Sequence, residues 1–141
     1  MKRKMNRRTF LKVSAVAGAT TAVSGFPTFL RAQAPEIKLG SIQPVTGAIS
    51  EIGISMRRGN QLAVDNINAQ GGIKSMGGAK LKLLLADTEA KEEVARSEAE
   101  RVIKEGAACL VGPFLSGNAM TIATLCEQRG VPFVMDVAAA D

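Results

Sequence analysis

The residues best placed for binding chemistry are Ser116, Gly117 and Asn118, which open a helix predicted over residues 116–129. The Ser116 hydroxyl and the free amides of Gly117 and Asn118 form a site of the kind that binds a carboxylate, because the helix dipole favours negative charge at this end. Each charge-assisted hydrogen bond there contributes about 1.5–3 kcal/mol. The other interpretation is that Ser116 only caps the helix, a role worth about 1 kcal/mol. The sequence leaves both interpretations open.

The composition excludes several kinds of catalytic and metal site. The chain has no histidine, so neither a Ser-His-Asp triad nor a histidine-based metal site can be formed from it. The segment from Gly40 to Gly47 reads GSIQPVTG, which fits neither the dinucleotide pattern GxGxxG nor a phosphate-binding GxxxxGK loop. We therefore expect no cofactor, no metal and no enzymatic activity.

The two cysteines, Cys109 and Cys126, lie in apolar surroundings, with no CxxC spacing that would indicate a redox or zinc site. We expect both to act as small buried hydrophobic residues. A disulfide between them is the alternative in an oxidising compartment.

Strand-like and helix-like segments alternate along the chain. They would position the candidate binding residues Ser116, Gly117 and Asn118. The expected strands cover residues 37–43, 80–86, 108–112 and 132–137, and the expected helices cover 55–69, 91–105 and 116–129. This order predicts an α/β fold with a doubly wound parallel sheet, in the spatial order 2-1-3-4. No helix follows the last strand before Asp141, so we expect an incomplete domain.

Helical spacing of apolar residues predicts which side of each helix faces the sheet. The expected inward residues are Gly59, Ala63 and Ile67 with Leu62 and Val64 beside them, then Ala95, Ala99, Val102 and Ile103, then Ala119, Ile122 and Cys126. The charged residues of 91–105 are expected on a solvated face.

In an open parallel sheet, ligands bind outside the carboxyl ends of the strands, where the direction of the connections changes. Those ends are followed here by residues 44–53, 87–90, 113–118 and 137–141. The loops after the first and third strands flank the point of change. The sequence therefore predicts a binding site at this edge, with Ser116 in it.

Residues 1–34 have the composition of an export leader. They contain seven basic residues and no acidic one, and Arg7-Arg8 followed by Phe10-Leu11-Lys12 resembles the twin-arginine export signal of bacteria, with Asn6 where Ser or Thr is usual. The apolar stretch is too short and too polar for a membrane anchor. We expect residues 1–34 to be a signal peptide and 35–141 the exported body. Twin-arginine export normally carries proteins that have already folded in the cytoplasm.

Without the leader the chain carries 11 basic and 13 acidic residues, so the alkaline character belongs to the leader. A nucleic-acid partner requires clustered positive charge on the folded body, and we therefore expect none.

Three segments resemble the branched-chain amino-acid-binding proteins of ABC importers. They are IKLGSIQPVTGA at 37–48, DNINAQGGIK at 65–74, and LVGP at 110–113 followed by Ser116, and the similarity extends over residues 36–141. The resemblance implies a type I periplasmic binding fold, in which two lobes close on a small solute. This chain would supply an incomplete first lobe. The implied partners are an ABC permease of the inner membrane, the twin-arginine translocase during export, and the solute.

The resemblance also implies which residues hold the ligand. The serine and glycine that open the third helix fall at Ser116 and Gly117, and the backbone groups after the fourth strand fall at Val137, Ala138 and Ala139. A pocket side chain after the first strand, aromatic in leucine-binding members, falls at Ile52. A threonine of those members is replaced by Ala139. The implied ligand is thus a branched-chain amino acid or a related small carboxylate, amide or aromatic acid.

Two functions remain open at this point. The first is a periplasmic solute receptor that delivers its ligand to an ABC permease. The alternative is a periplasmic ligand-binding sensor module of a signalling system, built on the same lobe.

Overall fold

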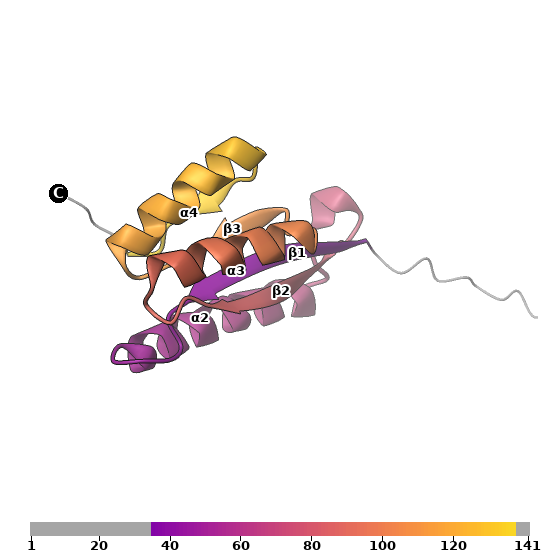
Figure 1. Ribbon diagram of the computed structural model, residues 1–141. Coiled ribbons are helices and arrows are strands. Elements are labelled where there is room, and N and C mark those ends of the chain that lie inside the picture. Colours follow the sequence, from indigo (N-terminus) through magenta and orange to yellow (C-terminus); the bar gives the residue numbers. More distant parts are fainter. Residues whose placement is uncertain (1–34, 138–141) are drawn as a thin grey trace, which may run out of the picture. The chain divides into compact units, whose positions relative to one another are not determined.

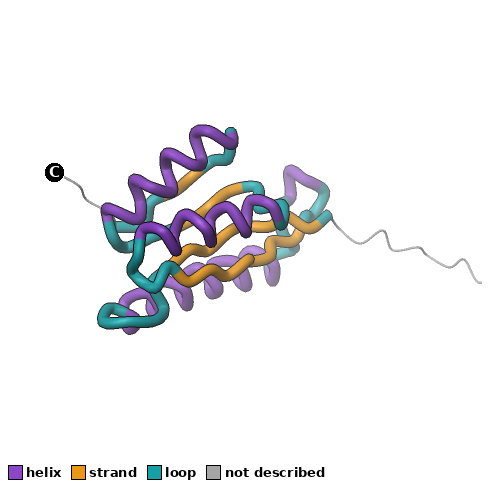
Figure 2. Tube along the Cα trace, viewed as in Figure 1, coloured by secondary structure: helices purple, strands orange, loops and turns teal. Residues whose placement is uncertain are grey.

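The computed structural model describes residues 35–137. These residues form a four-stranded parallel sheet with helices on both of its faces (Figures 1 and 2). The strands are β1 (Glu36–Gln43), β2 (Lys80–Asp87), β3 (Cys109–Val111) and β4 (Phe133–Val134). The helices are α2 (Ser50–Ala69), α3 (Glu92–Lys104) and α4 (Ser116–Arg129), with a short 3-10 helix η1 (Lys74–Met76) before β2. The predicted leader and residues 138–141 lie outside the described residues.

The spatial order of the strands is β2-β1-β3-β4, which confirms the predicted doubly wound α/β arrangement. β1 pairs with β2 from Glu36↔Lys80 to Gln43↔Asp87 and with β3 on its other side. Helix α2 covers one face of the sheet, whereas α3 and α4 lie on the other (Figure 1). The central position of β1 aligns the carboxyl ends of the strands at one edge.

The apolar core lies between the sheet and the pair α3 and α4. Because successive strand residues point to opposite faces, Ile42 and Leu110 face these helices. The helices contribute the buried side chains Ala95, Ala99, Val102, Ile122, Leu125 and Cys126. The predicted inward faces of α3 and α4 are therefore confirmed, with Ala119 buried and Ile103 partly buried as well.

The predicted inward face of α2 is confirmed only in part. Val64 is buried as expected and Ile67 is half-buried, but Gly59 and Ala63 are exposed, and Leu62 is 62% exposed. The side of α2 that faces the sheet also carries polar side chains: Asn60 Nδ2 donates to Ser41 Oγ at 3.1 Å, and Arg57 Nη2 donates to the Ala86 carbonyl at 2.6 Å. Hydrogen bonds to the sheet, which an apolar pattern does not register, thus orient this helix.

Asn68, near the end of α2, occupies the outer edge of β2. Its Nδ2 donates to the Leu81 carbonyl and its Oδ1 accepts from the Leu81 N–H, both at 2.8 Å. On the same strand, Arg101 Nη2 donates to the Leu85 carbonyl at 2.9 Å. Side chains thus satisfy backbone groups that an edge strand would otherwise leave open to pairing with another chain.

Two elements have a boundary that differs from the prediction by more than one residue. α2 begins at Ser50, five residues before the predicted start, because its first turn continues directly from the loop after β1. The last strand is limited to Phe133–Val134 of the predicted 132–137, since it pairs with only two residues of the short strand β3.

The cysteines are both free thiols, and the structure argues against a disulfide between them. Cys126 is buried in the core beside Leu110. Cys109 precedes Leu110 on β3, so its side chain points to the opposite face of the sheet. Burial raises the pKa of Cys126 to about 11, which keeps it a neutral thiol. Within residues 35–137, no helix has the length and apolar character needed to cross a membrane.

Replacing Asn68 with alanine tests the polar attachment of α2. The Asn68→Ala protein loses two hydrogen bonds to Leu81, and we expect its free energy of unfolding to fall by about 1–3 kcal/mol. Denaturant titration measures this difference. Asn66→Ala, an exposed position on the same helix, serves as the control and should change stability by less than about 0.5 kcal/mol. Equal effects of the two substitutions would contradict the proposed role of the Asn68 hydrogen bonds.

Candidate ligand-binding edge

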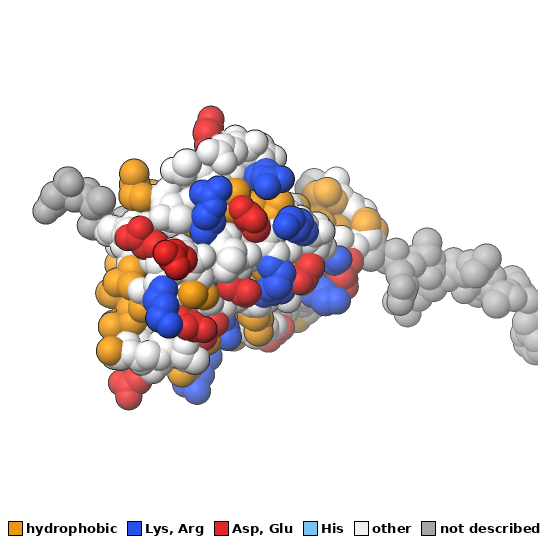
Figure 3. All heavy atoms as spheres, in the orientation of Figure 1, with side chains coloured by type: hydrophobic (Ala, Val, Ile, Leu, Met, Phe, Trp, Pro, Cys, Tyr) orange, Lys and Arg blue, Asp and Glu red, His pale blue; other side chains and the backbone are white. Residues whose placement is uncertain are grey.

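The carboxyl edge of the sheet is bordered by the loops after the four strands and by the first turns of α2, α3 and α4. Figure 3 shows hydrophobic side chains gathered toward this end of the molecule. Three exposed apolar residues belong to elements at this edge: Ile52, on the first turn of α2, and Met135 and Val137, after β4, which are 41%, 52% and 58% exposed. Apolar side chains together with a few polar groups are the kinds of residue that line small-molecule sites.

Asp87, the last residue of β2, binds the neighbouring loops. Its Oδ1 accepts hydrogen bonds from the N–H groups of Val45 and Glu89, and its Oδ2 accepts one from Thr46 Oγ1 at 2.8 Å. Burial alone would raise the pKa of Asp87, but these hydrogen bonds outweigh burial and lower the pKa below its usual value. The carboxylate therefore holds the loop after β1 against the end of β2.

The turn after Asp87 is strained. Glu89 and Ala90 both have left-handed backbone conformations, with φ of 49° and 59°, which non-glycine residues rarely adopt. Asp87 fixes the Glu89 N–H, and Thr88 Oγ1 accepts from the Ala90 N–H at 3.2 Å. These side chains hold the strained turn in place at the edge.

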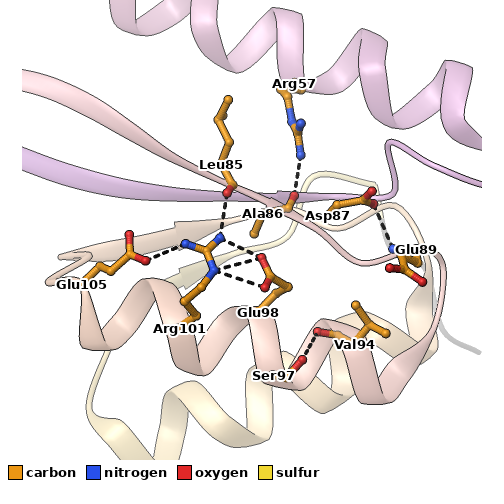
Figure 4. Close-up of polar contacts among 10 residues, drawn as sticks. All are labelled: Arg57, Leu85, Ala86, Asp87, Glu89, Val94, Ser97, Glu98, Arg101 and Glu105. Carbon is orange, nitrogen blue, oxygen red and sulfur yellow. Dashed lines mark hydrogen bonds and ion pairs between the residues drawn. The ribbon is translucent and has the colours of Figure 1, made fainter.

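Arg57 supports this corner from the side of α2. Figure 4 shows its guanidinium reaching the Ala86 carbonyl on one face of the sheet, while Arg101 lies on the other face between Glu98 and Glu105. Burial lowers the pKa of Arg57, and the charge of Asp87 partly opposes this effect. The positive charge of Arg57 and the negative charge of Asp87 thus attract each other next to the turn.

Gln43, the last residue of β1, crosses the sheet to the loop after β4. It is fully buried, and its Nε2 donates a hydrogen bond to Asp136 Oδ2. Gly112, at the end of β3, lies beneath this contact: a Cβ there would come within 2.9 Å of Gln43 Nε2 and collide with the Ile42 carbonyl. Its φ of 120° also favours glycine. The absent side chain makes room for the Gln43 amide.

The start of α4 differs from the prediction in one respect. Ser116 is the first helical residue, and Leu115 occupies the N-cap position without a side-chain cap hydrogen bond, so Ser116 is not the cap residue itself. A Cβ on Gly117 would collide with the Glu92 carboxylate, which therefore lies against this first turn. Asn118 is 2% exposed, and its Nδ2 has no hydrogen-bond partner among residues 35–137.

The predicted site residues that the structure describes all lie at this edge. Ser116 and Gly117 open α4, Ile52 lies on the first turn of α2, and Val137 follows β4. Ala138 and Ala139 fall outside the described residues, so their predicted role stays a prediction. Part of the carboxyl edge is polar in a way that the prediction missed: Gln43 and Asp87 end strands, and Asp136 follows one. Gln43 and Asp87 could have been found from the sequence, because each is a polar residue at the end of an apolar strand.

No group of three or more cysteine, aspartate or glutamate side chains within residues 35–137 is arranged to hold a metal ion. The edge therefore offers hydrogen-bonding groups, a helix start and apolar side chains as its means of binding.

Comparison with known families identifies the body and the leader. The model of the periplasmic binding proteins matches residues 36–141, most of the chain. The chain belongs to the periplasmic binding protein family. The model of the twin-arginine translocation signal matches residues 4–24, so this periplasmic binding protein is exported. The family consists of solute-binding proteins of transporters and is not a family of enzymes.

Individual relatives show how much of such a protein is present. The Leu/Ile/Val-binding protein BraC3 of Rhizobium johnstonii is 36% identical over 105 residues, which are 74% of this chain and 28% of that protein. The crystal structure of the branched-chain amino acid binding protein LivJ from Streptococcus pneumoniae in complex with isoleucine is 29% identical, with a TM-score of 0.70 over 75% of this chain and 30% of that one. A solute-binding protein from R. palustris in complex with 4-hydroxybenzoate is 25% identical, with a TM-score of 0.62 over 74% and 27%. The chain thus spans less than a third of the length of these relatives.

The hydrogen bonds of Asp87 predict an acid-sensitive contribution to stability in this periplasmic binding protein. Because its pKa is lowered by folding, the carboxylate stabilises the folded state above the ordinary aspartate pKa of about 4 and loses this effect as the pH falls through the folded pKa. We expect Asp87→Ala to lower the free energy of unfolding by about 1–3 kcal/mol at pH 7. The difference from the wild type should shrink toward pH 2.

Denaturant titrations at pH 7, 4 and 2 would measure this dependence. Asp65→Ala is the control, since Asp65 is exposed and accepts a single hydrogen bond from Gln61 within α2. A difference between the Asp87→Ala protein and the wild type that does not vary with pH would contradict the role given to the charge.

Proposed function

We propose that the chain is part of the solute-binding receptor of an ABC importer, which captures a small ligand carrying a carboxylate between two lobes. Residues 35–141 would contribute part of the first lobe, in agreement with the share of its relatives that the chain spans. The partners of the receptor are then the ABC permease of the inner membrane and, during export, the twin-arginine translocase. The receptor has no catalytic step.

One observation supports this proposal above the others. The start of α4, with Ser116 and Gly117, lies at the same edge of the sheet as the exposed apolar residues Ile52 and Val137. A helix start suits a carboxylate, and the apolar side chains suit a hydrocarbon group. The relatives described above are receptors of transporters, and no observation on this chain favours the alternative of a sensor module.

The Glu92 carboxylate occupies the place that a ligand carboxylate would take at the start of α4, so Glu92 would have to move when the ligand binds. It lies against Gly117, where a ligand carboxylate would approach the first turn of α4. Glu92 is exposed at the start of α3, so its side chain can rotate away into solvent. In the proposed receptor, ligand binding displaces this carboxylate from the helix start.

A ligand screen tests the proposed function. The thermal unfolding of the full-length protein would be followed with branched-chain amino acids, related amides and aromatic acids such as 4-hydroxybenzoate. A ligand at 100 times its Kd stabilises the folded state by about 2.7 kcal/mol, which raises Tm by several degrees. Purified residues 35–141 serve as the control and should show no shift, because the second lobe is missing. Absence of a shift in the full-length protein with every compound would contradict the proposal.

The role of Ser116 is tested by removing its hydroxyl. In the full-length protein, Ser116→Ala should weaken the binding of the ligand found in the screen by about ten-fold, because one hydrogen bond to a charged group is lost. Isothermal titration calorimetry measures the affinity. Thr124→Ala is the matched control, since Thr124 lies on the same helix and its hydroxyl bonds the Met120 carbonyl within α4. Equal affinity of the two variants would remove Ser116 from the site.

A further inference from the structure

The Glu92 carboxylate reaches from the first turn of α3 to the first turn of α4. Glu92 lies three residues before Ala95 and seven before Ala99, which are both fully buried, so it belongs to the face of α3 that meets the core. Glu93 lies three residues before the exposed Arg96, on the solvated face of the helix. Its position on α3 therefore directs Glu92, and not Glu93, toward α4.

Gly117 leaves the space that this carboxylate occupies. A Cβ at this position would lie 3.2 Å from the carboxyl carbon of Glu92 and would collide with its Oε1. All the atoms nearest to such a Cβ belong to Glu92. Gly117 has an ordinary helical conformation, so alanine would fit its backbone. The missing side chain thus makes room for a carboxylate of the chain itself.

The first turn of α4 attracts negative charge. The Ala119 N–H bonds back to the Leu115 carbonyl at 2.9 Å, so the N–H groups of Gly117 and Asn118 precede the hydrogen bonds of the helix. In the same turn, Asn118 Nδ2 is a buried donor without a hydrogen-bond partner among residues 35–137. This buried donor and the positive end of the helix dipole together favour an anion here.

Among the described residues, no basic side chain forms an ion pair with Glu92. Arg96, one turn further along α3, pairs with Glu100 at 3.7 Å, and Lys91 pairs with Glu89 at 2.8 Å. The charge of Glu92 is therefore balanced by the starts of α3 and α4, since it lies in the first turn of one and against the first turn of the other.

We infer that Glu92 is an internal competitor of the ligand, which occupies the start of α4 in the unliganded protein and thereby sets the affinity of the receptor. This inference rests on the proposed receptor function and adds a residue that regulates the same site. A ligand carboxylate gains the interactions of the helix start only when Glu92 gives them up. A helix start that is open about one tenth of the time weakens the apparent affinity about ten-fold.

Removal of the charge at Glu92 tests this role. Isothermal titration calorimetry on the full-length protein would measure the affinities for L-leucine, L-isoleucine and 4-hydroxybenzoate. Glu92→Gln keeps the size of the side chain and removes its charge, and we expect it to bind each probe that the wild type binds about three- to ten-fold more tightly. The controls Glu93→Gln and Glu51→Gln remove the same charge from the first turns of α3 and α2. They should change the affinities by less than about two-fold.

Three results would overturn the inference. An affinity of Glu92→Gln equal to or below that of the wild type would do so while leaving the proposed function intact. An equal gain in Glu93→Gln or Glu51→Gln would show that affinity follows the net charge of the edge and not the contact with α4. Binding of no probe by any of these proteins, together with no shift in the wider ligand screen, would overturn the proposed function as well.

A second measurement needs no ligand. Gly117→Ala places a Cβ where the carboxylate lies, so it should force Glu92 away from α4. In a Glu92→Ala background the new methyl group meets no carboxylate, and Gly117→Ala should raise the Tm of the full-length protein by about 2 °C, because alanine stabilises a helix relative to glycine. With Glu92 present, the same substitution should leave Tm unchanged or lower it. An equal rise in both backgrounds would show that Glu92 does not occupy the helix start.

Discussion

Hydrogen-bonded pairing of β1 along the full length of β2 and with β3 on its other side is the constraint on which the ligand-binding edge depends. This pairing fixes the register in which the strands end, and so brings Gln43, Asp87 and Gly112 to one edge although they are distant in sequence. The polar side chains that close the strands then bind the loops: Asp87 holds the loop after β1, and Gln43 holds the loop after β4. A shift of register by one residue would turn Gln43 to the opposite face and release Asp136.

Much of this architecture could be predicted from local patterns. The alternation of apolar strand-like runs with helical periodicity is enough to predict the order of the elements, and the strand order follows from the general rules of parallel crossovers. The inward faces of α3 and α4 were predicted correctly because the sides of these helices that meet the core are mainly apolar, with residues such as Ala99 and Ile122. The sequence also predicted that Ser116 and Ile52 lie at the carboxyl edge of the sheet, because the order of the elements determines which residues follow the strand ends.

The features that were missed depend on hydrogen bonds over long sequence distances. The face of α2 was predicted only in part, because Asn60 and Asn68 form hydrogen bonds to the sheet, and an apolar periodicity treats such residues as solvent-facing. The hydrogen bond between Gln43 and Asp136 joins residues that are 93 positions apart in the sequence. The local sequence around either residue therefore does not reveal this contact. Ser116 was misassigned by one position because a serine before an apolar helix resembles a cap, whereas Leu115 takes that position.

The two cysteines lie on opposite faces of the sheet as free thiols, and they are the only cysteines in the chain. No covalent cross-link therefore has to form within this body before its packing is complete, so its folding does not depend on the redox state of the compartment. A reducing cytoplasm is as suitable for it as an oxidising periplasm. This part of the protein thus needs no oxidising step for its own packing, which suits a route that moves folded cargo across the membrane.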